Sequence, residues 1–309
     1  MKQRVVVTGM GVLAPNGKTL DEFWQANVNG VSGIDYISLF DIKDFDIKIG
    51  GEVKNFDPAQ YILPSIYRKI DRFAQLGVCA AKMAIDDAAL SIDETNNSRV
   101  GVIVGTGLGG ILFHEEQIIS VIQNGGPSKI MASSVPRISP NSVSSYIAIA
   151  FGIKGLNYAV STACSSGANA IGQALIMLRS GLIDVCIAGG VEAPLTPVTV
   201  AGYQALRCLS SKDHNPKEAS TPFDKNRDGF VIGEGGGMLV IETLEHALKR
   251  KTRIYAELIG YGTNCGAYSM VAPQPDGQDA AVAIQAAIDD ADISPEKIDY
   301  INAHGTPLF

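Results

Sequence analysis

Short apolar runs separated by longer amphipathic segments recur along the whole chain. The runs with the length and β-branched content of buried strands are Arg4–Thr8, Ser98–Val104, Asn157–Ser161, Asp184–Ala188, Gly237–Glu242, Ile254–Gly260 and Asp299–Ala303. Between the first two, Arg68–Leu90 carries Phe73, Leu76 and Ala80 at helical spacing. Because helices alternate with strands, the pattern predicts an α/β fold whose mixed or parallel sheet is covered by helices.

The stretch Asn157–Leu178 joins one of these strands to a helix through a tight polar turn. Cys164 stands in the turn, and the helix after Gly167 is apolar or small on nearly every side, which predicts that it is buried all round. Free N–H groups and the helix dipole favour an anion at such a helix start, so a cysteine there is a candidate thiolate nucleophile. The alternative is a small buried cysteine packed beneath the helix.

An internal repeat links the two ends of the chain. Ala84-Ile-Asp-Asp-Ala88 precedes the strand that leads to Gly105, and Ala287-Ile-Asp-Asp-Ala291 precedes the one that leads to Gly305. The pattern indicates one α/β unit used twice. We therefore expect an N-terminal half at 1–252 and the start of a second half at 253–309. Since the second copy stops after its second strand, we also expect the chain to be truncated at its C-terminus.

Two glycine-rich segments follow predicted strands. Gly9–Gly17 is expected to close the first strand as a turn, and Gly105-Thr-Gly-Leu-Gly-Gly110 follows the second. Such segments can open a dinucleotide site, but a loop with Pro15 follows the first, and neither unit shows a persuasive ribose-binding acid. We favour glycines that let the backbone pack closely, and we expect no cofactor.

Composition excludes several classes of function. The 309 residues are 46% hydrophobic and 18% charged, as in a compact soluble protein with large cores. A net charge of −7 without a basic tract argues against nucleic-acid binding, and no apolar run approaches the ~18 residues of a membrane span. The five cysteines show neither metal-ligand spacing nor a disulfide framework, so we expect no metal and a reducing cytoplasm.

Several segments together resemble the β-ketoacyl-acyl-carrier-protein synthases, most closely the type II condensing enzymes of fatty-acid synthesis. They are Val5-Val-Val-Thr-Gly-Met-Gly-Val12, Ser161-Thr-Ala-Cys-Ser-Ser-Gly167, Gly189-Gly-Val-Glu-Ala193, Thr221–Gly235 and Asn302-Ala-His-Gly-Thr306, in family order. The resemblance implies a thiolase-type fold of two pseudo-equivalent α/β halves, with sheets packed around shared helices, in a homodimer. It also implies a partner, the acyl carrier protein in its acyl- and malonyl-loaded forms.

The resemblance assigns two residues to catalysis. Cys164 would accept the acyl group, and His304 would be the first of two histidines that polarise the malonyl thioester and assist its decarboxylation. The chemistry needs such groups because loss of CO₂ leaves an enolate, which imidazole N–H donors stabilise.

Further roles follow from the same resemblance. The residues expected to bind substrate are Leu108 in the acyl pocket, Phe230 beside the nucleophile and Thr306 on the pantetheine arm. Those resembling the basic patch that docks the acidic carrier protein are Arg68, Lys69, Arg72 and Arg207, although a basic trio is often only a solvated helix face. Those that match no functional position, and are expected at the surface, are His114, His214 and His246.

Three features depart from the family pattern. Relatives continue beyond Thr306 with a second threonine and a segment that holds the second histidine, whereas here Pro307, Leu308 and Phe309 follow. Ala132–Pro136 replaces a segment that usually carries aromatic residues. Ser269 and Val271 stand where histidine and threonine are common. We therefore expect this chain by itself to condense nothing at a measurable rate.

Two other functions remain open at this point. One is a non-catalytic partner subunit or degenerate fragment, against which Cys164 argues because such a subunit has no need of a nucleophile. The other is a thiolase acting on coenzyme A thioesters. The segments Asp228–Gly235 and Asn302–Thr306 favour the synthase over the thiolase.

Overall fold

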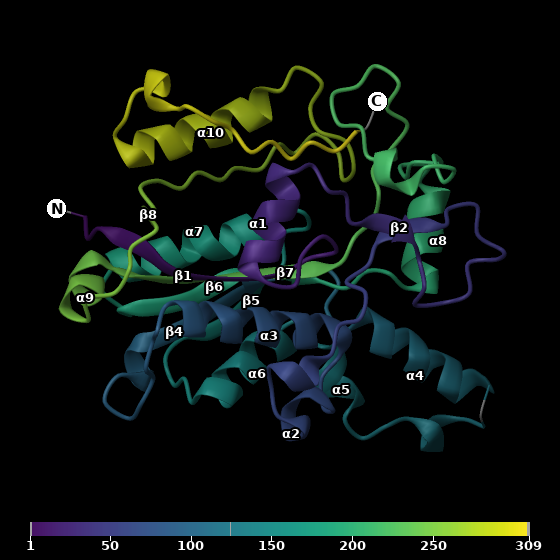
Figure 1. Cartoon of the computed structure of the whole chain (residues 1–309), viewed down its shortest axis with the longest axis horizontal. Helices are drawn as coiled ribbons and strands as arrows, with labels where there is room; N and C mark the ends of the chain where they lie inside the picture. Colours follow the sequence, from purple (N-terminus) through teal and green to yellow (C-terminus); the bar gives the residue numbers. More distant parts are fainter. Residues whose placement is uncertain (1, 124, 308–309) are drawn as a thin grey trace.

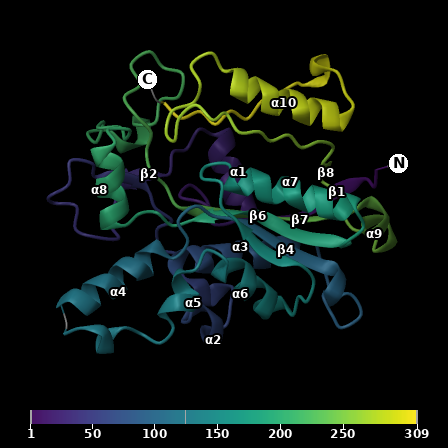
Figure 2. The ribbon, with the colours of Figure 1, turned by 180° about the vertical axis from the view of Figure 1, so that it is seen from behind.

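The computed structural model describes residues 2–123 and 125–307. Its centre is a six-stranded sheet with helices on both faces. In Figure 1, α3 and α6 cover the lower face of the sheet, α7 covers the upper face, and α10 lies above α7 as a further layer. Figure 2 shows the same layers from behind.

The strands of the main sheet are β1 (Val5–Leu13), β4 (Val100–Gly105), β5 (Asn157–Val160), β6 (Val185–Glu192), β7 (Gly235–Thr243) and β8 (Ala256–Glu257); β2 (Ile34–Tyr36) and β3 (Ile49–Gly51) form a separate pair. The helices are α1 (Leu20–Val28), α2 (Pro64–Tyr67), α3 (Arg72–Asp87), α4 (Ile111–Gln123), α5 (Ser134–Ile138), α6 (Ser142–Phe151), α7 (Ser166–Arg179), α8 (Pro197–Ala205), α9 (Leu244–Lys249) and α10 (Gln278–Ala291).

The sheet is mixed, as the alternation of strands and helices predicts. Its order is β5-β4-β6-β7-β1-β8, with β4 parallel to β5 and β6. The pairs β6–β7, β7–β1 and β1–β8 are antiparallel. Helix α3, expected within Arg68–Leu90, buries Phe73, Leu76 and Ala80 completely against the sheet.

Strand predictions fail at the two ends of the chain. The first strand does not end at Thr8, because β1 continues to Leu13 through a bulge between Val7 and Gly9. Of Ile254–Gly260 only the two residues of β8 pair. No strand forms at 299–303 in the described part of the chain, where Tyr300 is 79% exposed. An extended segment forms a strand only where a neighbour pairs with its backbone groups.

The glycines of β1 serve close packing against α3. A Cβ added to Gly9 would lie 2.2 Å from the Ala84 oxygen, and one added to Gly11 would lie 2.0 Å from the Ala80 oxygen. Any side chain at these two positions would therefore force the strand and the helix apart.

The second copy of the repeat packs in the same way. A Cβ added to Gly260 would lie 2.3 Å from the Ala287 oxygen, and one added to Gly262 would lie 2.1 Å from the Ala283 oxygen of α10. The repeated aspartates also act alike. The Met10 amide donates to Asp87 at 2.9 Å, and the Tyr261 amide donates to Asp290 at 3.0 Å. These matching contacts support the duplication inferred from the sequence.

Helix α7 is less buried than its composition suggests. Its sheet-facing residues Ala170, Ala174 and Leu175 are fully buried, but Ile176 is 48% exposed. The prediction of a helix buried all round is therefore wrong for the described structure. One face packs on the sheet, and part of the other meets Tyr261 in the second copy of the repeat, residues 253–307, which we call the second unit. The rest stays open to solvent.

A buried carboxylate, Glu242 of β7, joins three elements. It accepts hydrogen bonds from Thr8 of β1 and from Arg250, whose Nη2 lies 2.8 Å from Oε1, and it pairs with His246 of α9. Burial alone would raise the pKa of Glu242, but these partners lower that pKa to about 2. His246, expected at the surface, is instead part of this cluster, with a side chain 26% exposed.

We expect Glu242→Gln to destabilise the fold at pH 7 by about 3–5 kcal/mol, because it leaves the Arg250 charge without its partner. Since the folded-state pKa of Glu242 lies below the unfolded value of roughly 4.3, its contribution is complete well above that value and is lost as the pH falls toward 2. Urea unfolding at pH 7, 5 and 3 should therefore show that the difference in unfolding free energy between Glu242→Gln and the parent becomes smaller as the pH falls. The exposed Glu245→Gln is the control. A gap independent of pH would contradict this account.

Candidate functional site

Cys164 lies on a sharp elbow between β5 and α7, and it is exposed. Hydroxyl groups hold the turn: Ser165 Oγ donates to the Thr162 oxygen at 2.8 Å, and Ser166 Oγ donates to the Ala163 oxygen at 2.6 Å. Ala163 has a φ of +52°, a left-handed conformation that costs a non-glycine residue roughly 1 kcal/mol. Strained residues of this kind cluster at functional sites.

The other cysteines differ from Cys164 in their surroundings. Burial raises the pKa of the Cys79 thiol to about 12 and also raises the pKa of Cys186 and Cys208. These three thiols therefore stay protonated near neutral pH. Cys164 and Cys265 are exposed, but only Cys164 precedes a long helix, where free N–H groups favour an anion. The alternative of a buried cysteine beneath the helix is wrong.

An aromatic pair stands beside the nucleophile candidate. Tyr203 of α8 has a raised pKa, first because of burial and then because of the nearby Cys164 and Cys208 thiols. Its ring meets that of Phe230 edge-on, with centroids 5.7 Å apart. Phe230, assigned by resemblance to the surroundings of the nucleophile, packs on Tyr203, whose pKa Cys164 helps to raise. No local sequence signal marks Tyr203, which lies near the end of a short helix.

The glycine-rich segment after β4 binds a carboxylate of the protein itself. Glu192, at the end of β6, accepts hydrogen bonds from the amides of Gly107 and Leu108 and from Thr106 Oγ1 at 3.0 Å. Burial raises the pKa of Glu192 despite these donors. The amides that a phosphate would need are thus occupied, which argues against the dinucleotide alternative. Leu108 projects from this loop and is 41% exposed.

Close backbone contact joins this loop to the elbow. A Cβ on Gly105 would lie 2.2 Å from the carbonyl carbon of Ser166, and one on Gly190 would lie 3.0 Å from the Cα of Gly167. Both glycines stand at the ends of parallel strands, β4 and β6. The start of α7 therefore rests directly on the sheet, which fixes the height of Cys164 above it.

His304 and Thr306 lie in an irregular segment of the second unit. His304 is exposed and Thr306 is partly buried. Gly305 has a φ of +60° and lies beside Pro222, which belongs to the segment that leads to Phe230. In Figures 1 and 2 the end of this segment reaches the loop beyond α8. No hydrogen bond between described residues joins His304 or Thr306 to Cys164.

The residues expected to dock a carrier protein fall into two groups. Arg68, Lys69 and Arg207 are exposed. Arg72, however, is bound to the buried Glu234 through two nitrogens, at 2.6 and 2.7 Å, and also donates to the Val53 oxygen. Its side chain is only 17% exposed. The structure gives Arg72 a role within the fold, so its charge is engaged by Glu234 and is not free to bind a carrier protein.

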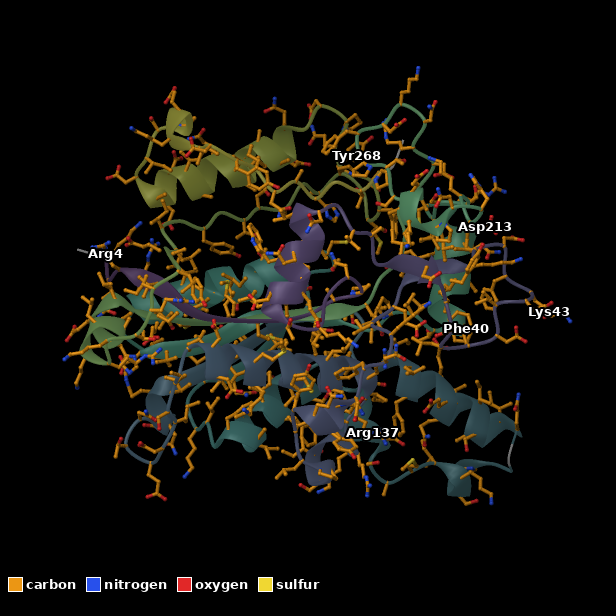
Figure 3. The ribbon with its side chains drawn as sticks, in the orientation of Figure 1. Arg4, Phe40, Lys43, Arg137, Asp213 and Tyr268 are labelled. Carbon is orange, nitrogen blue, oxygen red and sulfur yellow. The ribbon has the colours of Figure 1, made fainter. Side chains whose placement is uncertain are left out.

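The segments that depart from the family pattern lie at the surface. Ala132 and Val135 are exposed, as are Ser269 and Val271. Tyr268, labelled in Figure 3, stands on the upper side of the molecule, in the segment that connects β8 to α10 along the chain. The loop around it lines a hollow of about 620 Å³ bounded by Cys265, Met270 and neighbouring residues.

Within 2–123 and 125–307, no cluster of His, Cys, Asp and Glu side chains is arranged to hold a metal ion. Among the same residues, no helix has both the length and the apolar character needed to cross a bilayer.

Two family models match nearly the whole chain. The N-terminal domain of β-ketoacyl synthase matches residues 2–247, and the C-terminal domain of the same family matches residues 255–308. The chain belongs to the β-ketoacyl synthase family. The resemblance carried by its motifs is confirmed.

Curated relatives agree with this assignment. The chain is 45% identical over 305 residues to 3-oxoacyl-[acyl-carrier-protein] synthase 2 of Synechocystis, and 43% identical to the protein of that name in Vibrio cholerae. In both cases 99% of this chain and 73% of the relative are covered.

Solved structures confirm the thiolase-like fold. The ishigamide ketosynthase/chain length factor superposes with a TM-score of 0.91 at 34% identity, covering 99% of this chain and 74% of that one. A β-ketoacyl synthase from Burkholderia phymatum superposes with a TM-score of 0.90 at 29% identity, with 99% and 75% covered.

We expect Glu192→Ala to destabilise the chain by about 1–3 kcal/mol, because it removes the acceptor of two loop amides. Glu192→Gln should cost less, since its carbonyl can still accept from those amides. Unfolding free energies and hydrogen exchange of Gly107 and Leu108 measure both effects. Glu94→Ala, at an exposed turn, is the matched control. Unchanged exchange at both amides in Glu192→Ala would contradict the role of Glu192.

Proposed function

We propose that this protein is a β-ketoacyl-acyl-carrier-protein synthase, which transfers an acyl group to Cys164 and condenses it with malonyl-acyl carrier protein in fatty-acid elongation. The observation that carries the proposal is the exposed Cys164, held on a strained elbow at the start of α7 in a chain of this family. The names of the relatives from Synechocystis and Vibrio support the same reaction. The family match also favours a synthase over a thiolase.

The chemistry proceeds in two stages. Cys164 Sγ attacks the thioester carbonyl of the acyl-loaded carrier protein, and the carrier thiol leaves with a proton. The malonyl thioester then loses CO₂, and the resulting enolate carbon attacks the acyl-Cys164 carbonyl and expels the Cys164 thiolate. His304, which the family assigns to the enolate, would donate an N–H to its oxygen. The Cys164 amide, at the elbow, would serve as one oxyanion donor.

The acyl chain would extend toward Leu108 and the Tyr203–Phe230 pair. Leu108 stands on the loop anchored by Glu192, and its size would limit the length of the chain that fits. Thr306, at the start of the pocket in this scheme, would bond the pantetheine arm. Residues 1–252 would supply the nucleophile half, and residues 253–309 would begin the second half.

The acyl carrier protein is the proposed partner. A similar solved structure, with a TM-score of 0.89 at 34% identity, is described as a type II PKS acyl-carrier protein in complex with its ketosynthase. The exposed Arg68, Lys69 and Arg207 offer positive charge to an acidic carrier. We also propose that the reaction takes place in the cytoplasm, where the free cysteines would stay reduced.

We also propose a homodimer. Strand β5 stands at the edge of the sheet, where unpaired backbone groups invite a further strand. Exposed apolar residues gather on α4, namely Ile118, Ile119 and Ile122. A second copy of the chain would cover both features.

Transfer of an acyl group tests the proposed function. After incubation with an acyl-loaded carrier protein, the intact mass of the chain should rise by one acyl group. Cys164→Ala should reduce the transfer rate at least about 10³-fold, because it removes the nucleophile. Cys208→Ala, which alters a second thiol near Tyr203, should transfer at the parent rate. Equal transfer by Cys164→Ala and the parent would refute the proposal.

A further inference from the structure

Tyr261, from the second unit, lies across helix α7. A Cβ added to Gly172 of α7 would stand 2.1 Å from Cδ2 and Cε2 of the Tyr261 ring. The ring therefore occupies space that any other residue at position 172 would fill. This contact places the tyrosine on the outer face of the helix that begins beside Cys164.

The Tyr261 hydroxyl reaches the elbow through one side chain. It donates to Asn169 Oδ1 at 2.7 Å, one turn nearer the start of α7. Asn169 Nδ2 in turn donates to Thr162 Oγ1 at 2.7 Å and to Ser165 Oγ at 3.3 Å. Thr162 and Ser165 flank Cys164, so a continuous hydrogen-bonded path joins the second unit to the nucleophile turn.

The other end of Tyr261 is fixed as well. Its amide donates to Asp290, and Asp290 pairs with Arg179 at 2.7 Å, in the last turn of α7. Arg179 also donates to the Ile259 oxygen at 2.6 Å. The second unit thus holds α7 at both ends, and the tyrosine cannot swing away without breaking backbone and side-chain bonds.

We propose that Tyr261 is a positioning residue for Cys164, which acts through Asn169 to hold the elbow in its strained form. The proposal rests on the proposed function of Cys164. The left-handed conformation of Ala163 costs free energy, so it persists only because several surrounding hydrogen bonds hold the elbow in place. Because the same unit carries His304, one structural element both supplies that histidine and sets the orientation of the thiol.

The test is the rate at which iodoacetamide alkylates Cys164, followed by mass mapping over about pH 6 to 9. Tyr261→Phe keeps the ring over Gly172 but removes the hydroxyl. It should lower the alkylation rate about two- to tenfold across that pH range, the value of one hydrogen bond. The exposed Cys265 gives the reference rate within each molecule.

Two further variants test the path itself. Asn169→Ala should lower the rate to a similar extent, and the double variant Tyr261→Phe/Asn169→Ala should lower it no further, because both changes break one path. Tyr255→Phe is the matched control, since its hydroxyl donates to Asp87 at 2.9 Å and not toward the elbow. It should alkylate Cys164 at the parent rate.

The buried Cys79 and Cys186 distinguish loss of the fold from a change at the elbow, because they should stay unlabelled in every folded variant. If Tyr261→Phe exposes them, Asn169→Ala takes its place, because it breaks the same path and leaves the Tyr261 ring over Gly172. A Cys164 alkylation rate unchanged across that pH range in a folded Tyr261→Phe or Asn169→Ala variant would overturn the proposal, as would full additivity in the double variant. Alkylation does not require acyl transfer, so failure of the proposed function would appear separately, as an alkylated parent that accepts no acyl group.

Discussion

The site depends on how closely the sheet strands and the Tyr261 ring can approach the backbone of helix α7. Gly105 and Gly190 let two strand ends touch the first turn of the helix, and Gly172 admits the ring of Tyr261 on the opposite side. A methyl group at Gly105 would meet main-chain atoms that cannot move aside, whereas one at Gly172 would displace a side chain. The helix that presents Cys164 is therefore fixed from the sheet below and from the second unit above.

Buried or partly buried carboxylates then tie these close contacts together. Glu192 orders the loop that carries Leu108, Glu242 joins β1, β7 and α9, and Asp290 joins α7 to α10. Each carboxylate accepts hydrogen bonds from several donors, which offset the free-energy cost of placing a charge in the interior. Burial alone would raise the pKa of Asp290, but Lys2 and Arg179 lower that pKa to about 2. Glycines that allow close backbone contact and carboxylates that accept several hydrogen bonds thus fix the same helices and strands.

Much of this could be predicted from the sequence because the signals are local or repeated. The strand–helix alternation predicted the mixed sheet, and two copies of Ile-Asp-Asp-Ala predicted a duplication whose glycines and aspartates now make matching contacts. The position of Cys164 before α7 followed from a turn and an apolar helix. A resemblance of motifs does not show which partner a charged side chain binds in the fold, so it groups Arg72 with the docking residues although Glu234 binds it.

Other features have no local signature at all. Tyr261 and Asn169 lie far apart in the sequence, and only the fold brings the Tyr261 hydroxyl into hydrogen-bond contact with Asn169 of α7. Tyr203 has no sequence signal that relates it to either of them. The burial of α7 was overestimated for the same reason, because composition reports how apolar a helix is and not which neighbours cover it. Where pairing fails, as at 299–303, β-prone residues remain extended without becoming a strand.

In the proposed function the two units converge on one site, with His304 near Cys164. The most direct measurement replaces His304 by cysteine and asks whether a short bifunctional thiol reagent bridges position 304 to Cys164, as mapped by mass spectrometry of the digested chain. The account predicts an intramolecular bridge between these two positions in preference to one between position 304 and the exposed Cys265. A His304→Cys variant that bridges to Cys265 and never to Cys164 would contradict it.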